Sequence, residues 1–120
     1  MNSQFTNEVS RILALSREEA ARLANDTVGA ETLLLGILRQ GNTTVTEALK
    51  QLHSDPQEIK LALDNRLRVD HVSKMPNTDS ISLNESANNI LRLAVLEARR
   101  QHKSEVDVEH LMLAILHDFA

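Results

Sequence analysis

The chain has 120 residues, enough for one domain with a modest core, and its formal net charge of −4 disfavours nucleic acid or an anionic membrane as a main partner. It has no cysteine, which excludes disulfides and thiolate metal sites. Because no segment resembles a membrane span or a secretory signal, we expect a cytoplasmic protein with no membrane partner.

Aliphatic side chains must form the core, because aromatic residues make up only 2% of the sequence, and this favours helices over sheets. The first helix is predicted to begin after a capping Thr6 and to end at Asn25-Asp26. The second is predicted over about Ala30–Gln40, with Gly29 at its N-cap. No segment alternates apolar and polar residues as a half-buried strand does, so no strand is predicted.

Two shorter helices are predicted next. The segment Thr44-Val45-Thr46-Glu47 has the spacing of a capping box, with a glutamate three residues after a threonine, and should begin the third helix. Asp55-Pro56 has the cap and first-residue pattern of a fourth helix, which should run to about Leu67 or Val69. Residues 70–82 show no sustained period, and this is typical of a linker.

The remainder of the chain repeats its beginning. At an offset of 78 residues, 5–39 overlies 83–117 without a gap, and 12 of the 35 pairs are identical. A shared apolar period would not by itself reproduce the identical polar pairs, which are Glu19/Glu97, Arg22/Arg100 and Glu31/Glu109. By this correspondence Asn84 caps a fifth helix, and Asp107 caps a sixth over Val108–His117.

We therefore predict one all-α domain over 1–120, built as a duplication with an approximate twofold axis. Repeat one covers about 5–69, the linker about 70–82, and repeat two about 83–120. Repeat two is incomplete over the given residues, since nothing there corresponds to the third and fourth helices; either the polypeptide is a fragment or the second repeat has lost them. Six residues of the leucine-rich helices are predicted to be core: Leu33, Leu35, Ile37, Leu111, Leu113 and Ile115.

This pattern resembles a known family. The residues that carry the resemblance are Phe5-Thr6, Ile12-Leu13-Ala14-Leu15, Glu18-Glu19-Ala20, Val28-Gly29-Ala30-Glu31, Leu33–Arg39, Val106, Glu109-His110 and Leu111–Leu116. Together they resemble the Clp repeat domain, the duplicated helical module at the N-terminus of Clp-family AAA+ unfoldases, and most of all the ClpC type. The chain departs from the family where Gly-Thr-Glu-His is usual before the leucine-rich helix, and it lacks the last two of the usual eight helices.

The resemblance implies a non-catalytic docking module without a cofactor. Such domains take part in chaperone action and proteolysis: they capture unfolded or tagged substrates, or adaptor proteins, and pass them to an ATPase ring that can feed a Clp-type peptidase. The sequence leaves one other class open, a free-standing helical module that binds a small ligand or a partner helix in the groove between the repeats.

Two glutamates are the candidate binding residues. Glu31 and Glu109 each stand at the second position of a helix, where a carboxylate interacts favourably with the helix dipole. In some ClpC-like members, the acid at this position recognises the guanidinium group of phosphoarginine, so the resemblance implies a second interpretation. The candidate set adds their neighbours Ala30, Thr32, Val108 and His110.

We expect Glu31 and Glu109 to lie at equivalent, exposed positions of the two repeats. The Glu31 site should be the better anion receptor, because Gly29 and Ala30 leave the helix amides open, whereas the Asp107 side chain competes for them.

Other motifs are weak. Residues 36–43 have the glycine spacing of a phosphate-binding loop, but Asn42 replaces the lysine and Gly36 falls inside a predicted helix. His110 and His117 share a helix face without a third metal ligand nearby in sequence, so no metal site is predicted. The arginines Arg22 and Arg100 are interpreted as surface residues, each within reach of a glutamate one helical turn earlier.

Overall fold

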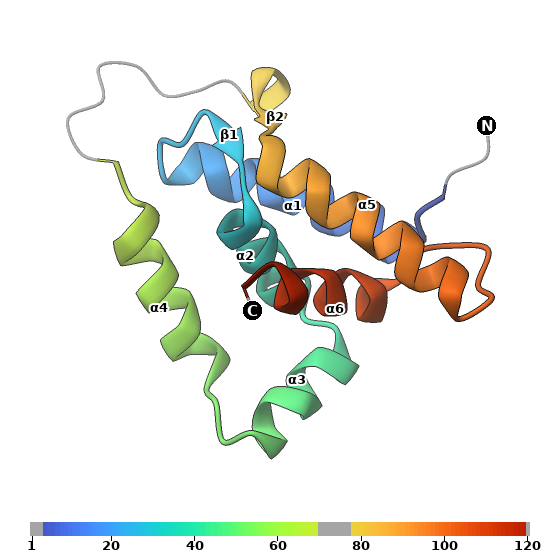
Figure 1. Cartoon of the computed structure of the whole chain (residues 1–120). Helices are drawn as coiled ribbons and strands as arrows, with labels where there is room; N and C mark the ends of the chain where they lie inside the picture. The colour runs from blue at the N-terminus through green and yellow to red at the C-terminus, as the bar shows by residue number, and fades with distance from the viewer. Residues whose placement is uncertain (1–3, 70–77, 120) are drawn as a thin grey trace.

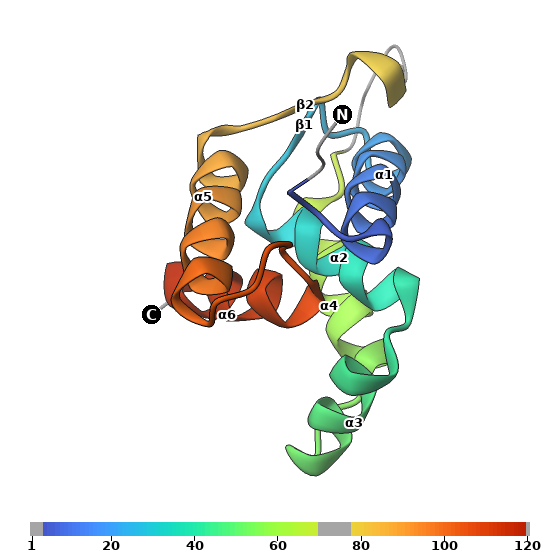
Figure 2. The same ribbon diagram turned by 90° about the vertical axis from the view of Figure 1, so that its right-hand side faces the viewer.

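The computed structural model describes residues 4–69 and 78–119 of the chain. The α-helices of these residues are α1 (Asn7–Arg22), α2 (Ala30–Gln40), α3 (Thr43–Gln51), α4 (Pro56–Leu67), α5 (Glu85–Arg100) and α6 (Val108–Phe119). Figure 1 shows α1, α2, α5 and α6 packed together, with α3 and α4 forming an arm beside them. In the view of Figure 2 the far end of α3 projects away from the other helices. No helix in the described ranges is long and apolar enough to cross a membrane.

Side-chain caps fix most of the helix starts. Thr6 accepts a hydrogen bond from the Val9 amide at 3.3 Å, and Asn84 accepts one from the Ala87 amide at 3.0 Å. These caps satisfy amide donors that have no partner inside the helix, and they confirm the predicted starts of α1 and α5. Asp55 also caps α4 as predicted, by accepting from the Gln57 amide at 2.9 Å.

The predicted start of α3 is wrong by two residues. Asn42 caps it and accepts from the Val45 amide at 3.3 Å, so the helix begins at Thr43 and the expected capping box at Thr44 does not form. An asparagine side chain reaches the third amide of the helix as well as a threonine does. The glycine before it, Gly41, ends α2 in the left-handed conformation with φ 74°.

The two repeats have matching helices. The offset of 78 residues carries both ends of α1 onto the ends of α5, and both helices have 16 residues. The same offset carries the first residue of α2 onto the first residue of α6. The duplicated sequence therefore folds into duplicated helix pairs, as predicted.

The chain segments before these helices cross between the repeats. The Asn84 amide donates to the Val28 carbonyl at 2.9 Å, and the Thr6 amide donates to the Val106 carbonyl at 3.0 Å. Since 6 corresponds to 84 and 28 to 106, each bond is the twofold counterpart of the other. Two such reciprocal bonds are what an approximate twofold axis between the repeats produces.

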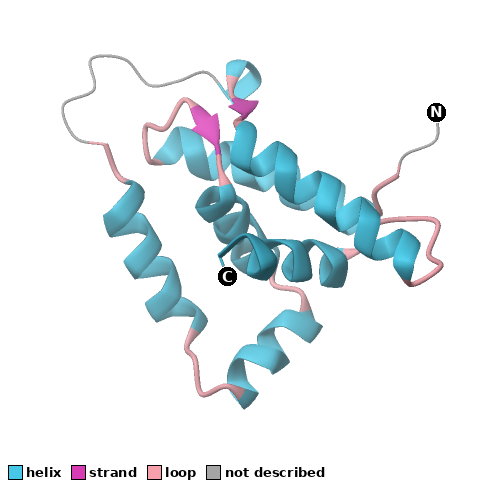
Figure 3. Ribbon diagram, viewed as in Figure 1, coloured by secondary structure: helices cyan, strands magenta, loops and turns pink. Residues whose placement is uncertain are grey.

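One of these crossings includes a short parallel pair of strands. β1 (Thr27–Val28) pairs with β2 (Ser82–Leu83), and Figure 3 shows them side by side in magenta. A 3-10 turn, η1 (Thr78–Ser80), precedes β2, and Ile81 between them is buried. The expectation of no strands is wrong here, because two-residue strands are too short to show an alternating pattern in sequence. The predicted linker over 70–82 falls partly outside the described residues.

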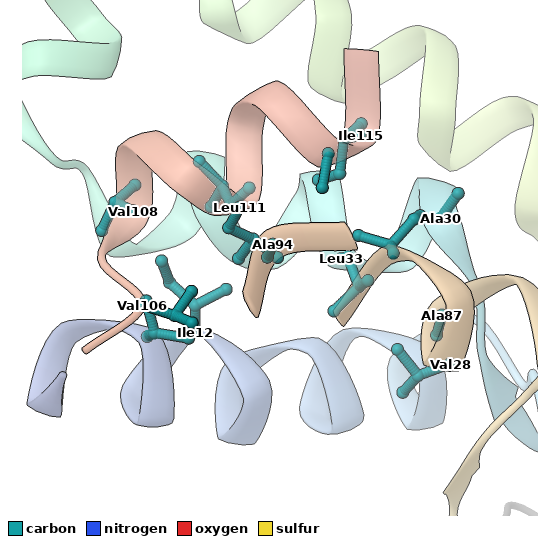
Figure 4. Packing of buried hydrophobic residues seen from close by; sticks show 14 of the residues in the cluster. Ile12, Val28, Ala30, Leu33, Ala87, Ala94, Val106, Val108, Leu111 and Ile115 are labelled. Atoms are coloured by element: carbon teal, nitrogen blue, oxygen red, sulfur yellow. The ribbon is translucent and has the colours of Figure 1, made fainter. Parts of the chain in front are cut away.

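The hydrophobic core lies between the repeats and draws equivalent residues from both. Ile12, Val28 and Leu33 of repeat one meet Val106 and Leu111 of repeat two (Figure 4). All five are essentially inaccessible to solvent. Burial of matched aliphatic residues from both repeats supplies most of the stabilisation that holds them together.

Five of the six leucine-rich core predictions are confirmed, and these residues are Leu33, Leu35, Ile37, Leu111 and Ile115. The sixth is wrong. Leu113 is 42% exposed, whereas its counterpart Leu35 is only 1% exposed. The difference arises because α4 packs against α2, and no described helix takes the same place against α6.

The glycine that suggested a phosphate-binding loop has a packing role. Gly36 lies within α2 against α1, and a methyl group there would overlap Ser16 Oγ and lie 2.8 Å from the Ile12 carbonyl oxygen. In repeat two the corresponding residues are Ala114 and Ala94, both buried. A small residue on each helix lets the paired helices of a repeat approach closely.

Candidate docking sites at two equivalent helix starts

The candidate binding residues surround the first turns of α2 and α6. Four of them are buried and fill the space beneath these turns: Ala30, Thr32, Val108 and His110. Only the two glutamates present functional groups to solvent, and they do so unequally. The Glu31 side chain is 25% exposed and that of Glu109 is 58% exposed. The expectation of equivalent positions is correct, and Glu109 is exposed as expected, but Glu31 is only partly exposed.

The start of α2 is held by a backbone-to-side-chain bond. The Gly29 amide donates to Thr32 Oγ1 at 3.3 Å, and Gly29 itself offers no side chain to cap the helix. Among the described residues, no side chain caps the first-turn amides of α2, as the sequence predicts for this site. A pocket of about 280 Å³ opens here between the repeats, and its lining includes Glu31, Asn84 and Asp118.

The start of α6 has the same plan with different side chains. The Asp107 amide donates to His110 Nδ1 at 2.9 Å, and His110 Nε2 lies 3.0 Å from Gln101 Oε1. Because Nδ1 accepts a hydrogen bond, these contacts assign the proton to Nε2, which donates to Gln101. His110 is therefore a buried structural residue with both ring nitrogens occupied, rather than an accessible ligand.

Asp107 closes the amide end of α6. Its Oδ1 accepts from the Val108 amide at 2.8 Å and from the Thr6 hydroxyl at 3.3 Å. The side chain thus occupies a helix amide that an anionic ligand would need, in agreement with the predicted competition. The pocket beside it, lined in part by Asp107 and Glu109, holds only about 60 Å³.

The carboxylate of Glu31 is already occupied. The guanidinium group of Arg66, on α4, forms an ion pair with Glu31 Oε2. In contrast, Oε1 of the Glu109 carboxylate lies 3.8 Å from Nε2 of the buried His110 ring. The same helix position therefore holds a guanidinium group in repeat one and presents an open carboxylate in repeat two. A guanidinium ligand would therefore meet an open carboxylate at Glu109, whereas the predicted advantage of the Glu31 site concerns anions at its helix amides.

A second ion-pair cluster attaches α4. Arg22 donates to both carboxylate oxygens of Glu19, at 3.0 and 3.2 Å, and to Asp64 Oδ1 of α4 at 2.7 Å. Its hydrogen bonds to Glu19 and then to Asp64 raise the pKa of Arg22 above its ordinary value. Burial is the largest single effect on the pKa of Asp64 and raises it, but the hydrogen bonds and charges of Arg22 and Lys60 together outweigh burial, so the net shift is downward.

Arg22 is exposed and pairs with Glu19, as predicted, but it also bridges α1 to α4 through Asp64, which the sequence did not predict. Its counterpart Arg100 is a surface residue, as predicted: it pairs with Glu97 at 2.9 Å, and no described residue corresponds to Asp64. Sequence reasoning missed Asp64 and Arg66, because a pairing over this separation leaves no local pattern.

Metal ligation finds no support in the geometry. Within residues 4–69 and 78–119, no three histidine, aspartate or glutamate side chains lie close enough together to hold an ion. His110 is buried and bonded, whereas His117 is exposed, so the two histidines differ in environment despite their shared helix.

The fold and these helix starts define a two-repeat, all-α domain with acidic side chains at equivalent positions of both repeats. Residues 4–119 match the Clp repeat (R) N-terminal domain, and the chain belongs to that family. It is 33% identical over 118 residues to the chaperone protein ClpB of Oceanobacillus iheyensis, and 30% identical over 118 residues to the negative regulator of genetic competence ClpC/MecB of Bacillus subtilis.

Each of these matches covers 98% of this chain but only 14% of the relative, so the similarity concerns the N-terminal part of much longer Clp ATPases. Among solved structures, the Hsp104 N-terminal domain from Candida albicans superposes with a TM-score of 0.76 at 19% identity, covering 97% of this chain and 75% of that one. That likeness shows the shared fold. The family assignment favours an unfoldase N-terminal domain over the free-standing ligand-binding alternative.

Proposed function

We propose that this domain acts by binding rather than by catalysis, and that it captures protein clients or adaptors for a Clp-type ATPase. Support comes from membership of the Clp N-terminal family. It also comes from the two equivalent helix starts, each of which carries one carboxylate. ATP hydrolysis would belong to other parts of such an ATPase, and the delivery of captured clients to a peptidase is part of the same proposal.

The observation that carries the binding mode is the Glu31–Arg66 ion pair. It is an intramolecular example of this helix position holding a guanidinium group, and a carboxylate can accept two hydrogen bonds from such a group. Glu109 offers the same chemistry at an exposed position. We therefore assign Glu109 to recognition of an arginine side chain of a client or adaptor.

Phosphoarginine is a narrower version of this ligand. Its guanidinium part suits Glu109, but the Asp107 carboxylate beside it would repel the phosphoryl group, and the open amides that could bind that group lie in the first turn of α2 in repeat one. Arginine without phosphate is thus the better match for repeat two. Phosphoarginine would need Arg66 to leave Glu31 first.

The test is a titration of the purified chain with short arginine peptides, with and without phosphorylation of the arginine. Glu109→Ala should weaken binding of the unmodified peptide by about tenfold, the loss expected for one charge-assisted contact. Glu31→Ala should have little effect on that peptide. Glu85→Ala is the matched control, because Glu85 is another exposed glutamate in the first turn of a helix. Equal binding by all three variants would remove Glu109 from the site.

A further inference from the structure

The turn that follows α5 gathers positive charge. The helix ends in Arg99 and Arg100, and Lys103 follows two residues after its cap. His102 stands in the left-handed conformation with φ 58°, and the Lys103 amide donates to the Ala98 carbonyl at 2.8 Å. This bond closes a common type of helix end and folds the chain back over the last turn of α5. Lys103 is thereby brought to the same part of the surface as Arg99.

Repeat one makes the same turn without the charge. Ala24 has φ 60°, and the next amide closes the turn in the same way. Ala21 stands there in the place of Arg99. Asn25 stands in the place of Lys103. One backbone turn therefore carries two cations in repeat two and neither of them in repeat one, so folding of the turn does not require them.

Arg99 and Lys103 line one pocket of about 230 Å³. Both repeats contribute to it, and the lining is completed by Gln4, Val95, Ala98, Ser104 and Val106. Its walls are fixed, because Ala98 and Val106 are buried and the Val106 amide donates to the Gln4 carbonyl at 2.6 Å. Figure 1 shows the connection between α5 and α6 at the same end of the molecule as the segment before α1.

The two cations have no acidic partner among the described residues. The ion pairs formed by these residues include neither Arg99 nor Lys103. Glu97 is engaged by Arg100 at 2.9 Å, and Glu105 does not line the pocket. Two like charges at one site repel each other, and an anion bound between them offsets that repulsion.

The helix face at this pocket belongs to the crossing between the repeats. In repeat one, the bonds that join α4 to α1 and its following turn are made at Arg22 and Asn25. Arg17, the counterpart of Val95, instead donates to the Ile81 carbonyl at 3.3 Å, in the crossing segment. A bond to a carbonyl, such as Asn25 makes, would leave the positive charge of a lysine uncompensated. The pocket is therefore defined by contacts within the described residues and by the charges that line it.

We propose that this pocket is a binding site for a glutamate side chain of a partner protein. The carboxylate sits between the Arg99 guanidinium and the Lys103 ammonium, and each donates a charge-assisted hydrogen bond to it. The methylene stem of the glutamate packs against the apolar wall formed by Val95 and Val106. The inference goes beyond the proposed function, because it concerns a different site and a ligand group of opposite charge.

The probe is a short peptide of alternating glutamate and alanine, blocked at both ends, and the purified chain is titrated with it while amide NMR shifts are followed. Saturable shifts are expected at Ser104 and Val106, and a matched glutamine peptide should cause none. Arg99→Ala/Lys103→Asn gives this turn the side chains of repeat one, which forms the same turn. The double variant should bind the glutamate peptide at least about tenfold more weakly, as expected when charge-assisted contacts are lost.

A second double variant controls for net charge. Arg11→Ala/Arg68→Ala removes two other exposed arginines, and it should leave the affinity nearly unchanged because distant surface charges are screened. Thermal unfolding checks that both variants are folded; if the first melts early, Arg99→Gln/Lys103→Gln removes the same charges with longer side chains. The first variant should also bind the arginine peptide of the Glu109 test as well as the wild type does, so failure of either proposal is distinguishable from failure of the other.

Three outcomes would overturn the inference. The first is the absence of saturable shifts around the pocket. The second is equal weakening by the control double variant, because the peptide would then respond to net charge alone. The third is a phosphoserine peptide that binds more tightly than the glutamate peptide and is lost in the same variant, because the pocket would then serve phosphorylated partners.

Discussion

Leu35 and Leu113 form a matched pair for testing how α4 stabilises the domain. They stand at equivalent positions of α2 and α6, so replacing either with alanine changes intrinsic helix propensity equally. They differ in surroundings, since Leu35 is 1% exposed and Leu113 is 42% exposed. The two substitutions therefore isolate the contribution of the covering helix.

The expected losses follow from burial. Leu35→Ala removes a fully buried side chain and leaves a closed cavity, which costs about 2–5 kcal/mol of unfolding free energy. Leu113→Ala removes a side chain that is little more than half buried, and solvent can fill the space. Full burial of a leucine contributes about 1.5–3 kcal/mol, so this substitution should cost about 0.9–1.7 kcal/mol.

Urea unfolding followed by circular dichroism measures both values. The comparison holds if the dependence of free energy on urea is the same for the two variants and the wild type, because a changed slope would signal an altered denatured state. A Leu113→Ala variant that lost as much stability as Leu35→Ala would show that Leu113 is covered in solution, and it would refute this reasoning.

Further predictions concern the packing and polar contacts of repeat one. Asp64→Asn should lower the free energy of unfolding by about 1–3 kcal/mol at neutral pH. Because the folded-state pKa of Asp64 is lowered, the stability advantage of the wild type should be present above about pH 4 and should vanish as the pH falls through that lowered pKa; urea unfolding at a series of pH values measures this. Gly36→Ala should lower the free energy of unfolding by about 1–3 kcal/mol, because the added methyl group overpacks the contact with Ser16. Adding Ser16→Ala should restore part of that loss, since repeat two has alanine at both places; a double variant with no recovery of melting temperature would contradict the Gly36–Ser16 contact. Ala24→Gly should stabilise by about 0.5 kcal/mol, because Ala24 has φ 60° and glycine adopts that conformation without strain, although it also gains entropy when unfolded; a lower melting temperature would count against it.

The duplication and the helix starts could be predicted from sequence because their causes are local. Thr6 and Asn84 bond amides three residues away, and such caps leave a recognisable pattern. The identical pairs at the 78-residue offset then predict two matching helix pairs. The reciprocal bonds at Val28 and Val106 follow from the same symmetry, but only the structure identifies them.

The failures have tertiary causes. Leu35 and Leu113 sit in the same local pattern, so no property of the leucine-rich segments separates the buried residue from the exposed one. Their difference depends on α4, which is attached through Asp64 and Arg66 at contacts distant in sequence. The expectation that Glu31 is exposed is wrong for the same reason, since Arg66, which pairs with its carboxylate, comes from another helix.

Symmetry in the sequence thus produces an asymmetric surface. In repeat one, α4 is tethered to its own chain, so its effective concentration at the Glu31 face is high and even weak ion pairs keep it in place. At Glu109 no helix of the described residues is held in this way, so the arginine of a client or adaptor that we propose for this site would bind at that partner's own concentration. The ion pair in repeat one shows which side chain such a carboxylate can hold, and the arginine proposed for Glu109 rests on that chemistry.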